Sequence, residues 1–277
     1  MLTLGGRTRI MGVLNVTPDS FSDGGRYEKT DAAIAQGEKL AAQGADILDI
    51  GGESTRPFAD PVPAGEEIRR VGPVIKALAG RVTVPISVDT TKAEVAREAL
   101  ELGASIINDV SALRMDAAMG TLAASSGVPV VLMHMLGSPR TMQRKPFYRD
   151  VVADIYTFLE DAISRAVTAG IARDRIIVDP GIGFGKNLQH NLELIRNLGH
   201  FHGLDAPILI GPSRKAFIRA LLSEEFQEEI QADRPVVETG TLAAVCAAAL
   251  NGAHLVRVHD VAGARAALKV IDALREG

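Results

Sequence analysis

Short apolar, β-branched runs alternate with longer amphipathic segments along the whole chain. The short runs predict strands at residues 9–16, 45–50, 85–89, 105–110, 129–134, 175–179, 207–211 and 254–259. The longer segments repeat apolar residues at helical spacing. They predict helices near residues 31–43, 66–79, 92–102, 116–126, 151–169, 188–197, 214–222, 239–251 and 261–275. This regular alternation predicts parallel strands joined by right-handed crossovers.

The number of these units indicates the fold. Repeated β/α units without a shift in composition predict an α/β protein, a closed (β/α)8 TIM barrel forming one domain over residues 1–277. An open doubly wound sheet is the alternative, but it usually has fewer strands and a G-x-G-x-x-G turn, which this chain lacks. The charged segment 223–235 is expected to be a surface excursion within the seventh unit.

Polar side chains close several predicted strands on the face that a barrel turns toward its axis. Side chains two positions apart in a strand share a face. Five strands carry such polar residues at their carboxyl ends: Asn15, Asp89, Asn108, Asp179 and the pair Arg257 and His259. One polar strand end is common, because Asp or Asn often caps the next turn. Five of them at the mouth of one barrel indicate a common site.

The predicted mouth combines two chemistries. Carboxylate and amide groups, which suit a planar heterocycle rich in N–H donors, come from Asp89, Asn108 and Asp179. Positive charge, which suits a phosphate or another anion, comes from Arg56, Lys215, Arg257 and His259. Asn15 and nearby hydroxyl groups are suited to a hydrated Mg²⁺ that is bound mainly through phosphates. In the segment 211–215, we expect Ser213 to cap a helix whose first turn contains Lys215.

Composition limits the partners and the compartment. The net charge is −4 and no long run of Lys or Arg occurs, which argues against nucleic acid. The chain has one cysteine, Cys246, so a disulfide framework is excluded and a reducing compartment is expected. We expect no signal peptide and no membrane span, because neither an apolar leader core nor 18 consecutive apolar residues occur. The expected location is the cytoplasm.

Several motifs together resemble those of the dihydropteroate synthase family of folate biosynthesis, over most of the chain. They are M-G-V-L-N-V-T-P-D-S-F-S-D-G-G (11–25), D-I-G-G-E-S-T-R-P (49–57), S-V-D-T (87–90), I-N-D-V-S (107–111), L-M-H-M (132–135), D-P-G-I-G-F-G-K (179–186), S-R-K (213–215) and R-V-H-D-V (257–261). The resemblance implies that 4-aminobenzoate displaces pyrophosphate from 6-hydroxymethyl-7,8-dihydropterin pyrophosphate. It also implies Mg²⁺, a homodimer and a response to sulfonamides.

The resemblance further implies roles for individual residues. The pterin would be bound by Asp89, Asn108, Met133, Asp179, Phe184, Lys215 and Arg257. The pyrophosphate would be bound by Asn15, Arg56, Arg257 and His259, with Mg²⁺ on Asn15. Thr55 and Ser213 would lie near the aminobenzoate, and the catalytic residues would be Asp19, Phe21, Thr55, Arg56 and Lys215. The polar segment 15–25 would act as a lid over the reacting carbon.

The chain departs from the family pattern at Phe58 and Ala216, and two alternative functions remain open. Phe58 stands where the family usually has Gly, and Ala216 stands where Ser is common, which concerns the aminobenzoate site rather than the pterin pocket. A pterin-binding methyltransferase would use Asp89, Asn108 and Asp179, but would not need T-P-D-S-F-S-D or S-T-R-P. A non-catalytic pterin-binding barrel would not need the cations of the leaving-group site.

Overall fold

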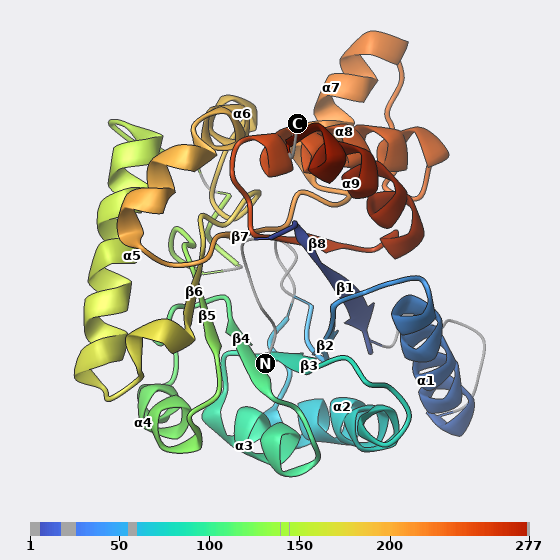
Figure 1. Ribbon diagram of the computed structural model, residues 1–277, viewed down its shortest axis with the longest axis vertical. Coiled ribbons are helices and arrows are strands. Elements are labelled where there is room, and N and C mark those ends of the chain that lie inside the picture. Colours follow the sequence, from blue (N-terminus) through green and yellow to red (C-terminus); the bar gives the residue numbers. More distant parts are fainter. Residues whose placement is uncertain (1–5, 18–25, 55–59, 139, 144, 276–277) are drawn as a thin grey trace.

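A closed parallel barrel surrounded by helices forms the protein (Figure 1). The computed structural model describes residues 6–17, 26–54, 60–138, 140–143 and 145–275. Within these residues, one eight-stranded parallel sheet has the order β6-β5-β4-β3-β2-β1-β8-β7. A single bridge from Val178 in β6 to Ile208, just before β7, joins the two ends of the sheet. The predicted (β/α)8 barrel is therefore confirmed, and the open sheet is excluded.

The strands are short and the helices follow them in chain order. The strands are β1 (Arg9–Asn15), β2 (Ile47–Gly51), β3 (Ile86–Asp89), β4 (Ile106–Asp109), β5 (Val130–Met133), β6 (Ile176–Asp179), β7 (Leu209–Ile210) and β8 (Leu255–Val258). The α-helices are α1 (Arg26–Ala42), α2 (Ala64–Ala79), α3 (Ala93–Glu101), α4 (Ala117–Ser126), α5 (Val151–Thr168), α6 (Leu188–Arg196), α7 (Ala216–Phe226), α8 (Pro235–Leu250) and α9 (Val261–Arg275). Two 3₁₀ segments, η2 (Arg173–Arg175) and η3 (Leu198–Leu204), precede β6 and β7.

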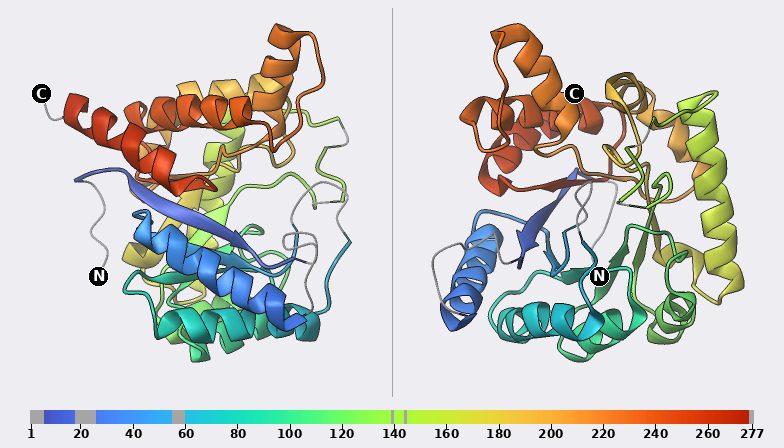
Figure 2. Two further views of the ribbon diagram at one scale, coloured as in Figure 1. Left: turned by 90° about the vertical axis from the view of Figure 1, so that its right-hand side faces the viewer. Right: turned by 180° about the vertical axis from the view of Figure 1, so that it is seen from behind.

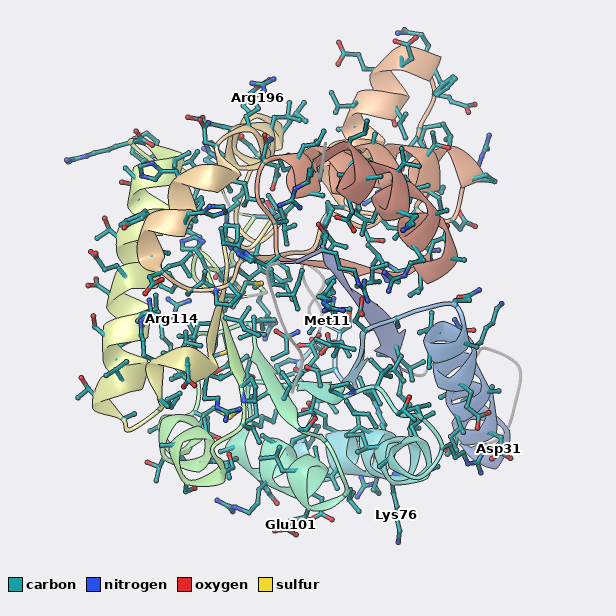
Figure 3. All side chains as sticks on the ribbon, in the orientation of Figure 1. Met11, Asp31, Lys76, Glu101, Arg114 and Arg196 are labelled. Carbon is teal, nitrogen blue, oxygen red and sulfur yellow. The ribbon has the colours of Figure 1, made fainter. Side chains whose placement is uncertain are left out.

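Apolar side chains fill the space on both sides of the strands. The barrel interior holds one layer of buried side chains, contributed by Met11, Ile47, Ile106, Val131, Ile177, Leu209 and Leu255. A larger core lies between the strands and the helices. Figure 3 shows Met11 within the ring of strands, whereas Lys76 and Glu101 lie on the outer rim. The inner layer closes the barrel below the mouth, so polar residues above it are held on a rigid base.

A charged cluster stabilises the opposite end of the barrel, where the strands begin. The Asp46 carboxylate accepts hydrogen bonds from the guanidinium groups of Arg7 and Arg265 and from the backbone N–H of Ile10. Arg9 lies 3.3 Å from the same carboxylate. Although burial opposes ionisation, these partners hold the pKa of Asp46 below its usual value. A charged cluster at this end of a barrel, away from the mouth, contributes to stability rather than to chemistry.

Some predicted boundaries were wrong. Helix α1 begins at residue 26 rather than 31, and α7 continues to Phe226, so the predicted excursion is partly helical. The part of it that follows α7 is mostly exposed, and α7 projects from the ring of helices (Figure 2). Ser213 does not cap a helix, because α7 begins at Ala216 after Lys215 and has no side-chain cap. The two 3₁₀ segments were not predicted.

Candidate active site

The polar strand ends predicted from the sequence meet at one end of the barrel. In the strand register, Asp89 lies opposite Gly51 on one side and Asn108 on the other. Met133 lies opposite Asp179 in the pairing of β5 with β6. All four residues named on β3 to β6 are at least nine-tenths buried. Alternation along each strand therefore places these side chains above the apolar layer of the barrel, as the sequence predicts.

Arg257 of β8 connects the acidic residues across the barrel. Its Nε donates to Asp49 Oδ2 at 2.6 Å, and a terminal nitrogen donates to Asp89 Oδ2 at 2.7 Å. Asn108 also donates to Asp49 Oδ2, at 3.0 Å. The second oxygens of Asp49 and Asp89 are buried and have no hydrogen-bond partner among the described residues. Unsatisfied buried acceptors of this kind suit a ligand that carries N–H donors.

Burial changes the protonation of two of these carboxyl groups. Burial raises the pKa of Asp89 to about 7, although the charge of Arg257 acts in the opposite direction. Burial also raises the pKa of Asp179 to about 6, against the hydrogen bond from the Gly181 N–H and the charge of Lys215. Both groups therefore change charge near neutral pH. Shifts of this size are frequent at functional sites.

The glycine-rich segment 179–186 packs closely against two neighbouring loops. Gly181 has a φ of +72°, and a Cβ at this position would lie 1.9 Å from the carbonyl oxygen of His134. Gly183 has a φ of +81°, and its Cβ would lie 2.9 Å from the side chain of Lys215. Only glycine accepts both the conformation and the close approach. The turn thus brings the backbone after β6 directly beside Lys215.

Two further contacts complete the mouth of the barrel. The Lys215 ammonium group lies 3.9 Å from the centre of the Phe184 ring, a cation–π contact. Ser213 Oγ lies 2.9 Å from His259 Nδ1, and the backbone N–H of His259 donates to the same hydroxyl group. The residues after β7 are therefore tied to the end of β8. The strands β7 and β8 thus bring Lys215, Arg257 and His259 to the mouth, where Arg257 pairs directly with Asp49 and Asp89.

The comparisons with known proteins agree with this geometry. The family described as pterin binding enzyme matches residues 11–259. A dihydropteroate synthase of Escherichia coli K12 is 46% identical over 264 residues, covering 95% of this chain and 90% of that protein. The chain belongs to the dihydropteroate synthase family. It is therefore a transferase of folate biosynthesis.

Solved structures of the family have the same fold. A dihydropteroate synthase from Xanthomonas albilineans with 4-aminobenzoic acid has a TM-score of 0.90 and 46% identity, covering 98% of this chain and 94% of that one. A structure of the X. albilineans synthase in complex with 7,8-dihydropteroate has a TM-score of 0.88 and 44% identity, covering 100% and 96%. A Yersinia pestis synthase in a sulfonamide drug complex has a TM-score of 0.91 and 44% identity, covering 100% and 98%.

The structure brings together many of the residues that the resemblance to dihydropteroate synthases singled out. Arg257 joins Asp89, while Met133 and Phe184 belong to one buried apolar cluster. Asn15 closes β1 and is partly exposed. Four predicted residues lie outside the described part of the chain, so their roles stay predictions: Asp19, Phe21, Thr55 and Arg56. The roles assigned to the other residues also stay predictions, although their positions suit them.

Sequence reasoning did not select two residues of the site, Asp49 and Lys186. Asp49 is fully buried and accepts hydrogen bonds from both Arg257 and Asn108. Its alternation with Ile47 in β2 would have placed it inside the barrel. Lys186 is 3% exposed, and its Nζ donates to His134 Nδ1 at 2.9 Å and to the Phe184 carbonyl at 3.0 Å. Burial and the nearby positive charge of Lys186 lower the pKa of His134 to about 2, so the ring is neutral and accepts this bond.

The donor set of the described residues limits how a metal is bound. No group of three or more His, Cys, Asp or Glu side chains in the part of the chain that the structure describes is arranged to hold a metal ion. The Asn15 amide oxygen at the mouth fits a hydrated Mg²⁺, which commonly takes one or two protein oxygens and completes its shell with phosphate and water.

Among the described helices, none is long and apolar enough to cross a membrane.

Proposed function

We propose that this protein joins 4-aminobenzoate to 6-hydroxymethyl-7,8-dihydropterin pyrophosphate, giving 7,8-dihydropteroate and pyrophosphate, with Mg²⁺ assisting the loss of pyrophosphate. The observation that carries the proposal is the Arg257 network, which gathers Asp49, Asp89 and Asn108 beneath a cationic rim. Relatives crystallised with 4-aminobenzoic acid and with 7,8-dihydropteroate support it.

The carboxylates are proposed to bind the pterin through its N–H donors. An ionised carboxylate accepts two parallel hydrogen bonds from the edge of an amino-pyrimidinone ring. Asp179 and Asp89, whose pKa values lie near 6 and 7, would supply this acceptor once ionised. Asn108 offers both an amide donor and an acceptor next to them. Lys215, whose ammonium group lies over the Phe184 ring, would donate to a ring acceptor of the pterin.

The cationic rim is proposed to stabilise the departing pyrophosphate. Arg257 and His259 lie at the carboxyl end of β8, and the resemblance adds Arg56 and Asn15. A bound Mg²⁺ would supply Lewis-acid neutralisation of the charge that develops on the leaving group. As the carbon–oxygen bond breaks, positive charge spreads over the pterin, and ionised Asp89 and Asp179 favour that charge. Preorganised electrostatic groups of this kind commonly contribute about 3–4 kcal/mol each to transition-state stabilisation.

The amine of 4-aminobenzoate then attacks the pterin carbon. Attack needs the nitrogen lone pair, and the lost proton can pass to solvent or to the departing pyrophosphate. Ser213, held by His259, lies at the rim where this second substrate is proposed to bind. The segment with Asp19 and Phe21 is proposed to cover the reacting carbon and to exclude water.

We also propose that the chain acts as a homodimer in the cytoplasm. The dimer is supported by apolar side chains exposed on the late helices: Leu250 is 56%, Val270 60% and Leu274 69% exposed. Monomeric proteins seldom expose contiguous apolar surface without a use for it. The free thiol of Cys246 is consistent with a reducing compartment. Sedimentation analysis of the wild type and of Val270→Glu would test the dimer, since a buried glutamate should dissociate it.

A coupled assay tests the reaction. Wild-type protein with Mg²⁺ and both substrates should release one pyrophosphate per dihydropteroate formed, and chelation of Mg²⁺ should slow release. Methyl transfer from methyltetrahydrofolate serves as the control for the alternative activity. Binding of a pterin without turnover, or methyl transfer without pyrophosphate release, would overturn the proposal.

A further inference from the structure

Side-chain donors hold the backbone of the glycine-rich turn after β6. The three successive carbonyl groups of residues 183–185 each accept one hydrogen bond from a side chain. Outside helices and strands, backbone groups need such partners, so the shape of this turn depends on these side chains. Among the three donors, Lys186 alone is almost fully buried. In the order of the carbonyls, the donors are Gln143 Nε2 at 2.7 Å, Lys186 Nζ at 3.0 Å and the Tyr148 hydroxyl group at 2.8 Å.

The amine of Lys186 ties this turn to the end of β5. Besides donating to the Phe184 carbonyl, its Nζ lies 2.9 Å from Nδ1 of His134, the residue that follows β5. Both partners are neutral acceptors, because burial lowers the pKa of His134 to about 2. Burial also lowers the pKa of Lys186 well below its usual value, although the charge of Asp179 acts in the opposite direction. An amine carries two or three hydrogens, so Lys186 can donate to both acceptors in either protonation state.

His134 gives Lys186 a rigid support. Its ring packs edge-on against Phe158, with 4.7 Å between the ring centroids. Phe158 belongs to α5, which packs beside β5 and β6 (Figure 1). The backbone N–H of His134 donates to the Asp179 carbonyl at 2.9 Å. The pair of Lys186 and His134 therefore joins β5 to the turn after β6, just beyond the last hydrogen bonds between the two strands.

The turn that Lys186 holds carries groups of the predicted pterin site. The Phe184 ring lies 3.9 Å from the Lys215 ammonium group. The Gly181 N–H donates to Asp179 Oδ1 at 2.7 Å. A small displacement of the turn would therefore disturb the ring, the ammonium group and the carboxylate together. Lys186 itself is 3% exposed, so it can affect a ligand only through these residues.

We propose that Lys186 is a positioning residue, which holds the turn of residues 180–186 in the shape that binds the pterin ring. It acts by linking the Phe184 carbonyl to the His134 ring. This inference rests on the proposed function, which assigns the pterin to Asp179 and Lys215. A site that is ordered before its ligand arrives binds more tightly, because no affinity is lost to ordering it. Without the Lys186 amine, the pterin would have to order the turn as it binds.

Lys186→Met is the first variant that tests the proposal, because methionine keeps an apolar stem and removes both hydrogen bonds. Calorimetry with 6-hydroxymethylpterin, which lacks the leaving group, measures the affinity of the pterin site alone. We expect its Kd to rise on the order of 10-fold, with a stoichiometry that stays near that of the wild type. Partial unfolding would instead lower the stoichiometry at an unchanged Kd. The melting temperature should fall as well, since two buried acceptors lose their donor.

A double variant separates positioning from stability. His134→Phe replaces the ring acceptor by an apolar ring, so its combination with Lys186→Met removes both polar partners of the contact. Such a paired replacement can be nearly neutral for stability. The melting temperature of the double variant should therefore recover toward that of the wild type. Its Kd should stay raised, because the Phe184 carbonyl still lacks its donor.

Ile75→Ala is the control for lost stability alone. Ile75 is fully buried in α2, among helices that do not touch the turn after β6. The substitution leaves a cavity and should lower the melting temperature. The Kd of 6-hydroxymethylpterin should stay within about twofold of the wild type, because distant sites act independently.

A Kd within about twofold of the wild type in Lys186→Met would overturn the inference. So would recovery of both the melting temperature and the Kd in the double variant, because Lys186 would then act on stability alone. If Lys186→Met does not fold, the double variant decides: a raised Kd supports the inference and an unchanged Kd overturns it. A wild-type protein that binds 6-hydroxymethylpterin but releases no pyrophosphate from the proposed substrates would overturn the proposed function and leave the role of Lys186 to be decided by the variants.

Discussion

Replacing Arg257 with methionine would leave two buried carboxylates without the cation that they share. The guanidinium group lies 2.6 Å from Asp49 and 2.7 Å from Asp89, and both carboxylates are at least nine-tenths buried. Removing one partner of a buried ion pair costs about 3–5 kcal/mol of stability. Methionine keeps much of the aliphatic stem, so little of this loss comes from packing. We therefore expect Arg257→Met to lose about 3–5 kcal/mol at pH 8.5.

The loss should depend on pH in a known direction. The folded-state pKa of Asp89 is already about 7, raised by burial and lowered by Arg257, so removing the arginine raises it further. A carboxyl group with a raised folded pKa binds a proton that the unfolded chain has released. Its contribution to stability is complete below the unfolded pKa of about 4 and is lost as pH rises to the folded pKa. The loss ends near pH 7 in the wild type but continues in the variant at about 1.4 kcal/mol per pH unit.

Urea unfolding at pH 7.0 and 8.5 measures both effects. Over these 1.5 pH units, the difference in free energy of unfolding between the wild type and the variant should grow by about 2 kcal/mol. Arg257→Met combined with Asp49→Asn should recover part of the loss, because one of the two unpaired charges is then removed. Arg81→Met, which breaks an exposed pair with Glu38, should cost at most about 1 kcal/mol. A loss below about 1 kcal/mol at pH 8.5, or one independent of pH, would refute the reasoning.

The other predictions concern the glycine turn, the acid limb of the pH profile and the core. Gly183→Ala should displace Lys215 and lower kcat/KM for the pterin substrate about tenfold, with about 1 kcal/mol of strain from its φ of +81°; unchanged kinetics would contradict it. In the wild type, kcat/KM for the pterin should rise with pH through about 6 to 7, as Asp179 and Asp89 ionise. In Asp179→Asn this rate constant should be low, and its pH profile should lack the rise near pH 6. Phe201→Ala, at a fully buried position, should cost about 3–5 kcal/mol in chemical denaturation without changing the pH profile.

Local patterns in the sequence were enough to predict most strands and helices of the barrel. Each strand is a short apolar run, and a Gly with positive φ, such as Gly44 or Gly252, follows several of the helices that precede a strand. The alternation rule also placed Asp89 and Asp179 correctly inside the mouth. These features depend on neighbours along the chain, and a single sequence contains them. The start of α1 was missed because its first residues lack an apolar repeat.

Contacts between distant residues could not be predicted in the same way. Asp49 was overlooked because its importance depends on Arg257, which is 208 residues away. Ser213 looked like a helix cap, but its hydroxyl group pairs with His259 on the next strand, and the helix begins three residues later. Lys186 stood in the sequence only as the last residue of the motif 179–186, whereas in the fold it is buried against His134. In each case tertiary partners decide the role, and a sequence pattern does not name them.

The barrel has one weak seam, where β6 meets the two-residue strand β7 through the bridge from Val178 to Ile208. The seam separates Asp179, which ends β6, from Lys215, which follows β7. Transient separation of β6 from β7 would widen the mouth between Asp179 and Lys215, while the hydrogen bonds between the other strands stay intact. Amide hydrogen exchange should accordingly be faster at Val178, whose N–H donates to Pro207, than at the centre of β1. A planar pterin ring could then enter the mouth between the ends of β6 and β7.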